Sequence, residues 1–195
     1  MKKLPRSFYS QSALLVAKDL LGKILVRKIG KTILSGKIVE VEAYLGVKDQ
    51  ASHAYRGRTK RNEVMFREGG CLYVYFTYGM HFCANIVTGR QGTGEAVLIR
   101  ALEPVTGIDV MKRKRGFAKS AGATHTLTNG PAKLCQALGI ERKENGIDLL
   151  GDEIYLIAGE PILKSSIGTS DRVGISREKE KQWRFFIRGN EWISK

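Results

Sequence analysis

The sequence predicts an α+β fold: a single domain with a curved, mostly antiparallel, open-barrel-like sheet, flanking helices and a protruding β-hairpin. Three observations lead to this prediction. Strand-like apolar segments follow one another across short glycine turns, which is typical of antiparallel hairpins. Only three stretches show helical spacing. No internal repeat, low-complexity tract or linker divides the 195 residues, so we expect one domain over residues 1–195.

The first part of the chain predicts a helix followed by a hairpin. Residues 10–21 have apolar side chains at helical spacing and end at Gly22, a residue that commonly terminates helices. Strands are predicted over 24–29 and 32–44, with a tight turn at Gly30 between them. In the second strand, the period of two places on one face Ile38, Glu40, Glu42 and Tyr44, and on the other Val39, Val41 and Ala43.

The middle of the chain predicts a long loop and three strands. Residues 45–70 are polar and cationic, which indicates a surface loop with short helical turns, and loops of this length are often functional. Strands are predicted over 71–77 and 81–87, joined through Tyr78, and over 95–102. The side chains that we assign to the core of the first of these strands are Leu72, Val74 and Phe76.

The second half predicts further helices and strands. Residues 104–115 form a helical pattern that ends in four consecutive cations, and residues 117–128 are small, polar and expected to be mobile. A helix over 132–138 begins after Pro131, which favours a first helical turn. Strands are expected over 153–158 and 184–188.

The charge balance indicates a polyanionic partner. The chain has 33 Lys and Arg against 19 Asp and Glu, a formal charge of +14, which favours nucleic acid or an anionic membrane surface. Two cationic runs, residues 56–67 and 112–115, favour a surface that follows phosphates. No apolar run approaches the ~20 residues of a membrane span, and no signal peptide precedes the domain, so we expect a cytoplasmic protein.

The cysteines predict neither a metal site nor disulfides. The sequence has three, Cys71, Cys83 and Cys135, each within an apolar segment and without a C-x-x-C pair or nearby histidines. We interpret them as small core hydrophobes in a reducing compartment, and we expect no metal and no cofactor.

Residues 37–85 concentrate the side chains that can perform chemistry. Glu42 could be a carboxylate facing water or ion-paired to an arginine; in a half-buried basic pocket it would instead stay ionised and take a proton from water. His53 could be a structural hydrogen-bonding residue. Tyr78 precedes a glycine at a predicted hairpin tip, where an aromatic ring could insert into a base stack rather than enter the core.

Six blocks carry a resemblance that covers about residues 10–192. In chain order they read IVEVEAYLG, HAYRGRTKRN, LYVYFTYGMHFCANI, VLIRALEP, NGPAKLCQALGI and RFFIRGNEW. Together they resemble the 3-methyladenine DNA glycosylase family of the alkyladenine type, in the form of a compact bacterial member. The resemblance implies a monofunctional DNA repair glycosylase that flips alkylated or deaminated purines out of duplex DNA and hydrolyses the N-glycosidic bond with an activated water, leaving an abasic site.

The resemblance also implies roles for individual residues. Glu42 matches the general base, and Arg100 matches the arginine beside the activated water and the DNA backbone. The residues that match those sandwiching and contacting the flipped base are Tyr44, His53 and Tyr75. No lysine occupies the position of Glu42, so a Schiff-base lyase route is not expected.

Four further matches concern discrimination and DNA contact. Asn85 matches the asparagine whose side chain obstructs the exocyclic amine of normal guanine. Tyr78 matches the tyrosine that fills the vacated stack, and Met80 and His81 fall at hairpin positions that face DNA. The implied partner is double-stranded DNA containing damaged purines, bound by a monomer that has no membrane association and is located at the nucleoid through its DNA.

A non-catalytic nucleic-acid-binding module is the competing prediction, because the composition fits it equally well. The pair of Glu42 and Arg100 distinguishes the two, since a pure binder gains nothing from a carboxylate placed against phosphates. A peripheral membrane protein is disfavoured, because no basic amphipathic helix with large apolar anchors is present.

Overall fold

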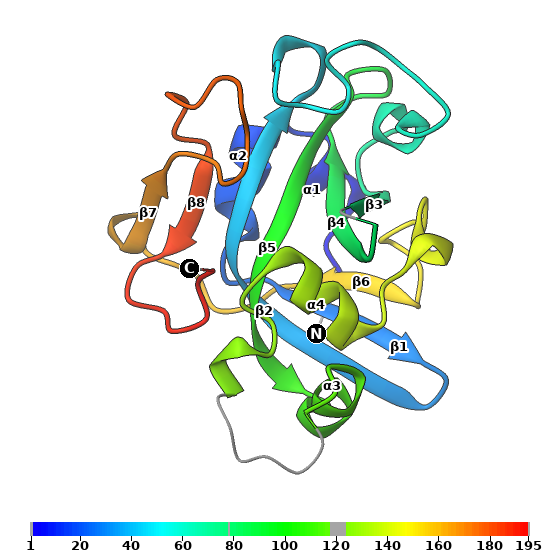
Figure 1. Cartoon of the computed structure of the whole chain (residues 1–195), viewed down its shortest axis with the longest axis vertical. Helices are drawn as coiled ribbons and strands as arrows, with labels where there is room; N and C mark the ends of the chain where they lie inside the picture. Colours follow the sequence, from blue (N-terminus) through cyan, green and yellow to red (C-terminus); the bar gives the residue numbers. More distant parts are fainter. Residues whose placement is uncertain (1, 78, 118–123, 195) are drawn as a thin grey trace.

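The structure is built on one antiparallel sheet of eight strands (Figure 1). It is a computed structural model that describes residues 2–77, 79–117 and 124–194. The strand order is β3 (Leu72–Thr77), β4 (His81–Thr88), β5 (Glu95–Thr106), β2 (Thr32–Leu45), β1 (Ile24–Ile29) and β6 (Ile154–Ile157). Beside this path, β8 (Arg184–Ile187) pairs with both β2 and β7 (Ile167–Ser170). The predicted α+β class with a mostly antiparallel sheet is confirmed.

Strand β2 organises the sheet because it has three partners. Its residues 35–45 pair with β5 along one edge. On the other edge, residues 32–37 pair with β1 and residues 40–42 pair with β8. The sheet therefore divides along β2 and curls, as the expected open-barrel shape requires, and the two glutamates of β2 lie where the division occurs.

An irregularity in β2 corrects one expectation about its faces. Ile38 pairs with Leu102 and Glu40 with Ala101, so the residue between them has no partner on β5. Such a bulge reverses the alternation of side chains. Ile38 consequently joins Val41 in the main core, whereas the unbroken period placed these two residues on opposite faces.

Four α-helices lie in the described part of the chain: α1 (Arg6–Tyr9), α2 (Ala13–Leu20), α3 (Ile108–Lys114) and α4 (Pro131–Leu138). Helix α2 packs against β2 and β5, and α4 packs against β4, β5 and α3. A smaller apolar cluster lies beneath the loop over residues 46–71 and includes Ala54, Met65 and Tyr73. The loop contains only short 3₁₀ turns, Gly46–Lys48 (η1) and Glu63–Phe66 (η2), as the sequence predicts.

The predicted helix over 104–115 is wrong at its start. Strand β5 continues to Thr106, and the helix begins only at Ile108. The reversal occurs at Gly107, whose φ of 77° favours glycine. A Cβ atom there would lie 2.7 Å from the carbonyl oxygen of Ile33, so the sheet itself excludes a side chain at this position.

Two other expectations differ from the structure. Phe76 is 40% exposed and packs beside Phe82 rather than entering the core. Of the segment 117–128 expected to be mobile, residues 118–123 lie outside the described residues. At its end, Leu127 and Thr128 are fully buried, and the Thr128 hydroxyl donates to the Leu102 carbonyl oxygen at 2.6 Å. The remaining short turns are Thr124–Thr126 (η3), Arg142–Glu144 (η4) and Lys164–Ser166 (η5).

No described helix combines the length and apolar character that crossing a membrane requires.

Candidate functional site

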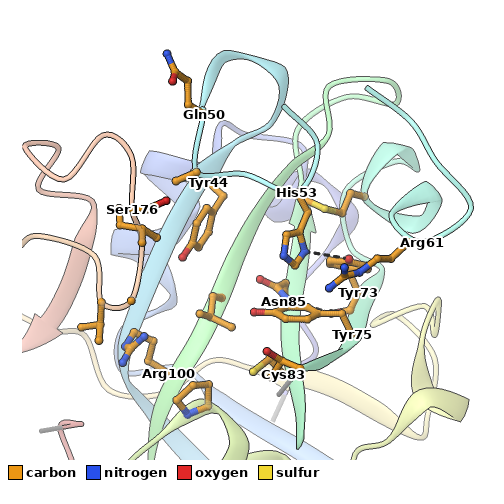
Figure 2. A pocket seen from close by; sticks show the side chains of 18 residues that line it. Tyr44, Gln50, His53, Arg61, Tyr73, Tyr75, Cys83, Asn85, Arg100 and Ser176 are labelled. Atoms are coloured by element: carbon orange, nitrogen blue, oxygen red, sulfur yellow. Dashed lines mark hydrogen bonds between the residues drawn. The ribbon is translucent and has the colours of Figure 1, made fainter. Parts of the chain in front are cut away.

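A cavity of about 370 Å³ opens among strands β2 to β5 and two loops (Figure 2). One loop follows β2, and the other joins β7 to β8 and contributes Val173 to Ser176. The cavity brings together residues predicted from widely separated parts of the sequence. Those that line it are Tyr44, His53, Tyr75, Asn85 and Arg100.

The cavity has aromatic walls on two sides. Tyr44 faces His53 and Tyr75 across the open space (Figure 2). The rings of His53 and Tyr75 meet edge to face with centroids 4.5 Å apart, and Tyr75 stacks on Tyr73 at 5.6 Å. Opposed aromatic walls of this kind suit a flat aromatic ligand.

The position of His53 is fixed by its neighbours. Its Nδ1 lies 3.2 Å from the Tyr73 hydroxyl. The side chain of Asn62 donates to the carbonyl oxygens of His53 and Gly57 at 2.8 and 3.0 Å, which closes the loop beneath the ring. Burial, and then the nearby Arg61 cation, lower the pKa of His53, so the imidazole is neutral at pH 7.

Glu42 lies directly behind the cavity wall and is fully buried. Its Oε1 accepts a hydrogen bond from the Val173 backbone N–H at 2.7 Å and lies 3.2 Å from Nη1 of Arg100. Its Oε2 accepts from the Tyr44 hydroxyl at 2.8 Å. Burial and the adjacent Glu42 carboxylate raise the pKa of Tyr44, so its hydroxyl remains a neutral donor.

Arg100 is shared between two buried carboxylates. Its Nε donates to Oε1 of Glu40 at 2.9 Å, while Nη1 faces Glu42. Arg184 donates to the same Glu40 oxygen at 2.6 Å, so two arginines balance two carboxylates. Although burial disfavours the guanidinium, Glu42 and Glu40 outweigh it and raise the pKa of Arg100. The site therefore places two buried carboxylates against two guanidinium groups beside an aromatic cavity.

Comparison with known proteins identifies the family. The sequence profile described as "Methylpurine-DNA glycosylase (MPG)" matches residues 7–191. The chain belongs to the methylpurine-DNA glycosylase family. Three curated members, each named "Putative 3-methyladenine DNA glycosylase", come from Carboxydothermus hydrogenoformans (53% identity over 98% of this chain and 98% of the relative), Clostridium acetobutylicum (46%, 98% and 97%) and Chlorobaculum tepidum (47%, 100% and 92%). The resemblance stated from the six sequence blocks is confirmed.

In this methylpurine-DNA glycosylase family member, a buried ion pair supports the Tyr44 wall. The Arg172 guanidinium lies 4.6 Å from the centre of the Tyr44 ring. It also donates two hydrogen bonds to the fully buried Asp49 carboxylate, at 2.6 and 2.9 Å. Neither residue was predicted from the sequence, because the pair joins positions 123 residues apart and no local pattern marks it.

The cavity also contains predicted and unpredicted polar groups. Asn85 is 5% exposed, and its side-chain amide donates to the Tyr73 carbonyl oxygen at 3.3 Å. Cys83, interpreted from the sequence as a core residue, is buried but also lines the cavity next to Tyr75. Burial raises the pKa of the Cys83 thiol, so it stays protonated at pH 7. Across the described residues, no group of three or more His, Cys, Asp or Glu side chains is placed to hold a metal.

Two of the residues matched to DNA contacts, Met80 and His81, do not line the cavity. Met80 is 70% exposed and His81 begins β4, and both border a second surface depression next to α4. Tyr78 lies outside the described residues.

Proposed function

We propose that this methylpurine-DNA glycosylase family member excises damaged purines from double-stranded DNA by hydrolysing the N-glycosidic bond, leaving an abasic site. The observation that carries the proposal is the contact between the aromatic-walled cavity and the buried carboxylate: Tyr44 lines the cavity and donates directly to Glu42. We further propose, from the resemblance, that the enzyme acts as a monomer. Binding to duplex DNA would place the enzyme at the nucleoid.

The cavity suits a flipped purine. A base taken out of the duplex would stack between Tyr44 on one side and His53 and Tyr75 on the other. Neutral His53 can face an uncharged or a cationic base without electrostatic repulsion. Asn85, held by its bond to the Tyr73 carbonyl oxygen, would meet the exocyclic amine of guanine and so disfavour the normal base.

Glu42 is the proposed general base. Departure of a purine leaves an oxocarbenium-like sugar, which needs an anion and a nucleophilic water on the opposite face. Oε1 of Glu42 is occupied by Val173 and Arg100, but within the described residues Oε2 accepts one bond, from Tyr44. This leaves one lone pair for water. Since Glu42 has no exposed surface, we propose that a small side-chain shift at the cavity wall admits this water.

Flipping requires a group that fills the vacated stack. We assign this role to Tyr78 from the resemblance, with Met80 and His81 contacting the flanking DNA. The exposure of Met80 supports this assignment, since an apolar side chain in water gains from contact with bases or sugars.

Lesion-containing duplexes test the proposed reaction. We expect abasic sites from at least one of 3-methyladenine, 7-methylguanine, hypoxanthine and ethenoadenine, with strand breaks only after alkali treatment. Borohydride should trap no enzyme–DNA adduct, because no lysine lines the cavity in the described residues and water is the nucleophile. A trapped adduct would contradict the hydrolytic route. Binding of lesions without any release of base would instead favour the non-catalytic binding module.

Salt titration tests the nucleic-acid partner. The cationic runs lie at opposite ends of the molecule in Figure 1, in the loop after β2 and in α3. Contact with about four phosphates gives a log–log slope of affinity against salt of about −4 for undamaged duplex. Binding is measured by fluorescence anisotropy at several NaCl concentrations. A slope near zero would remove nucleic acid as the partner.

A further inference from the structure

We infer that Ser194 is a positioning residue of the active site, which orients the Arg100 guanidinium toward Glu42 by binding both Arg100 and Glu40. This inference rests on the proposed function. It concerns the segment after β8, which the sequence prediction did not connect with the site.

Ser194 contacts the buried carboxylate of Glu40 through two atoms. Its backbone N–H donates to Oε2 of Glu40 at 2.6 Å, and its hydroxyl donates to Oε1 at 2.7 Å. Arg184, already bonded to Oε1, also donates to the Ser194 carbonyl oxygen at 3.2 Å. Both the backbone and the side chain of Ser194 are therefore hydrogen-bonded to the charged groups of Glu40 and Arg184.

The Ser194 hydroxyl also contacts Arg100 directly. Nη2 of Arg100 lies 3.1 Å from the hydroxyl oxygen and donates to it. A hydroxyl supplies one donor and two acceptor sites, so donating to Glu40 and accepting from Arg100 are compatible. The Arg100 side chain is only 8% exposed, so water has little access to replace this bond.

These contacts define the plane of the guanidinium. Nε is held by Glu40 and Nη2 by Ser194, and the group is planar, so the remaining nitrogen, Nη1, is directed at Glu42. Without the hydroxyl, only the bond from Nε to Glu40 would hold the Nε–Nη2 edge of the guanidinium. The group could then rotate about that bond. A rotated guanidinium could approach Oε2 of Glu42 and occupy the lone pair that the proposed water needs.

The segment that carries Ser194 is itself anchored. Asn190 donates from its side chain to Glu103 at 2.8 Å and accepts from the Trp192 backbone N–H at 2.9 Å. Trp192 packs against the main core. The hydroxyl is therefore presented from a fixed backbone, which is what a positioning role requires.

The test compares excision with binding in Ser194→Ala. Single-turnover excision should slow by about 10-fold, because a misdirected catalytic group costs rate even when the substrate is bound. The dissociation constant for lesion DNA should stay within about twofold, since Ser194 is not among the cavity-lining residues. Ser194→Thr, which keeps the hydroxyl, should restore most of the rate.

Ser170→Ala is the matched control. The Ser170 hydroxyl accepts from Nη1 of Arg184 at 3.1 Å and donates to the Asp171 carbonyl oxygen at 3.2 Å. Within the described part of the chain it bonds neither Glu40 nor Arg100, so excision should be unchanged. The inference alone is overturned if Ser194→Ala keeps the parent excision rate. It is also overturned if this variant binds lesion DNA more weakly and melts at a lower temperature while its excision rate is unchanged. A parent chain that releases no base from any lesion overturns the proposed function, and this inference with it.

Discussion

Replacing Glu42 with glutamine is expected to lower single-turnover excision by at least ~100-fold while lesion binding is retained. Glutamine keeps the size of the side chain, and its carbonyl oxygen can still accept from Val173 or Tyr44. It cannot take a proton from water, and it provides no anion for the developing positive charge on the sugar. The rate is measured with enzyme in excess over a duplex that carries the preferred lesion.

Glu153→Gln provides a control with the same chemical change. Glu153 bonds the Arg27 side chain at 3.3 Å, and its own side chain is 70% exposed. It does not line the cavity, so its replacement should leave excision at the parent rate. If Glu42→Gln excises at the parent rate as well, the general base must be another group and the proposed mechanism fails.

The local parts of the fold were predictable because their signals are local. The hairpin of β1 and β2 follows from two strand-like segments around Gly30, and α4 follows from Pro131 and Gly139 at its two ends. The bulge near Glu40 was not predictable, because it depends on pairing with β5 rather than on the composition of β2. The extension of β5 to Thr106 was missed for the same reason: its partner, β2, lies far away in the sequence.

The candidate site likewise has parts that the sequence predicts and parts that it does not. The sequence blocks identified the aromatic walls and the pair of Glu42 and Arg100, and the structure brings these residues together. Two groups that bond the buried carboxylates come from the last quarter of the chain. Val173 binds Glu42 across 131 residues, and Ser194 binds Glu40 across 154. Such pairs have no spacing rule, so only the folded chain shows them.

The second large effect is expected at the ion pair behind Tyr44. Replacing Arg172 with methionine should lower the free energy of unfolding by about 3–5 kcal/mol, because the change leaves a buried carboxylate without its cation. Both side chains of the pair are 0% exposed. The variant also loses the bond to the Ala43 carbonyl oxygen and the contact with the Tyr44 ring. Urea unfolding, followed by tryptophan fluorescence, measures the loss.

The dependence of this loss on pH separates charge from packing. In the parent protein, burial acts to raise the pKa of Asp49, but the hydrogen bonds from Arg172 hold it below its usual range. Asp49 therefore contributes stability that is present above its unfolded pKa of about 3.9 and is lost as pH falls through the lower folded value. Without Arg172, burial should raise the pKa of Asp49 instead. The folded variant then binds the extra proton, and its stability falls as pH rises.

The stability gap between the parent and Arg172→Met should consequently be wider at pH 7 than at pH 5. The double variant Asp49→Asn, Arg172→Met should recover part of the loss at pH 7, because its buried amide carries no charge. Both carboxylate oxygens of Asp49 also accept backbone N–H groups, from Leu45 and Ala51, and the amide can keep only one of these bonds, which limits the recovery. An equal gap at both pH values without recovery in the double variant would show that Arg172 stabilises the fold by packing against Tyr44 and Trp183 rather than by neutralising Asp49.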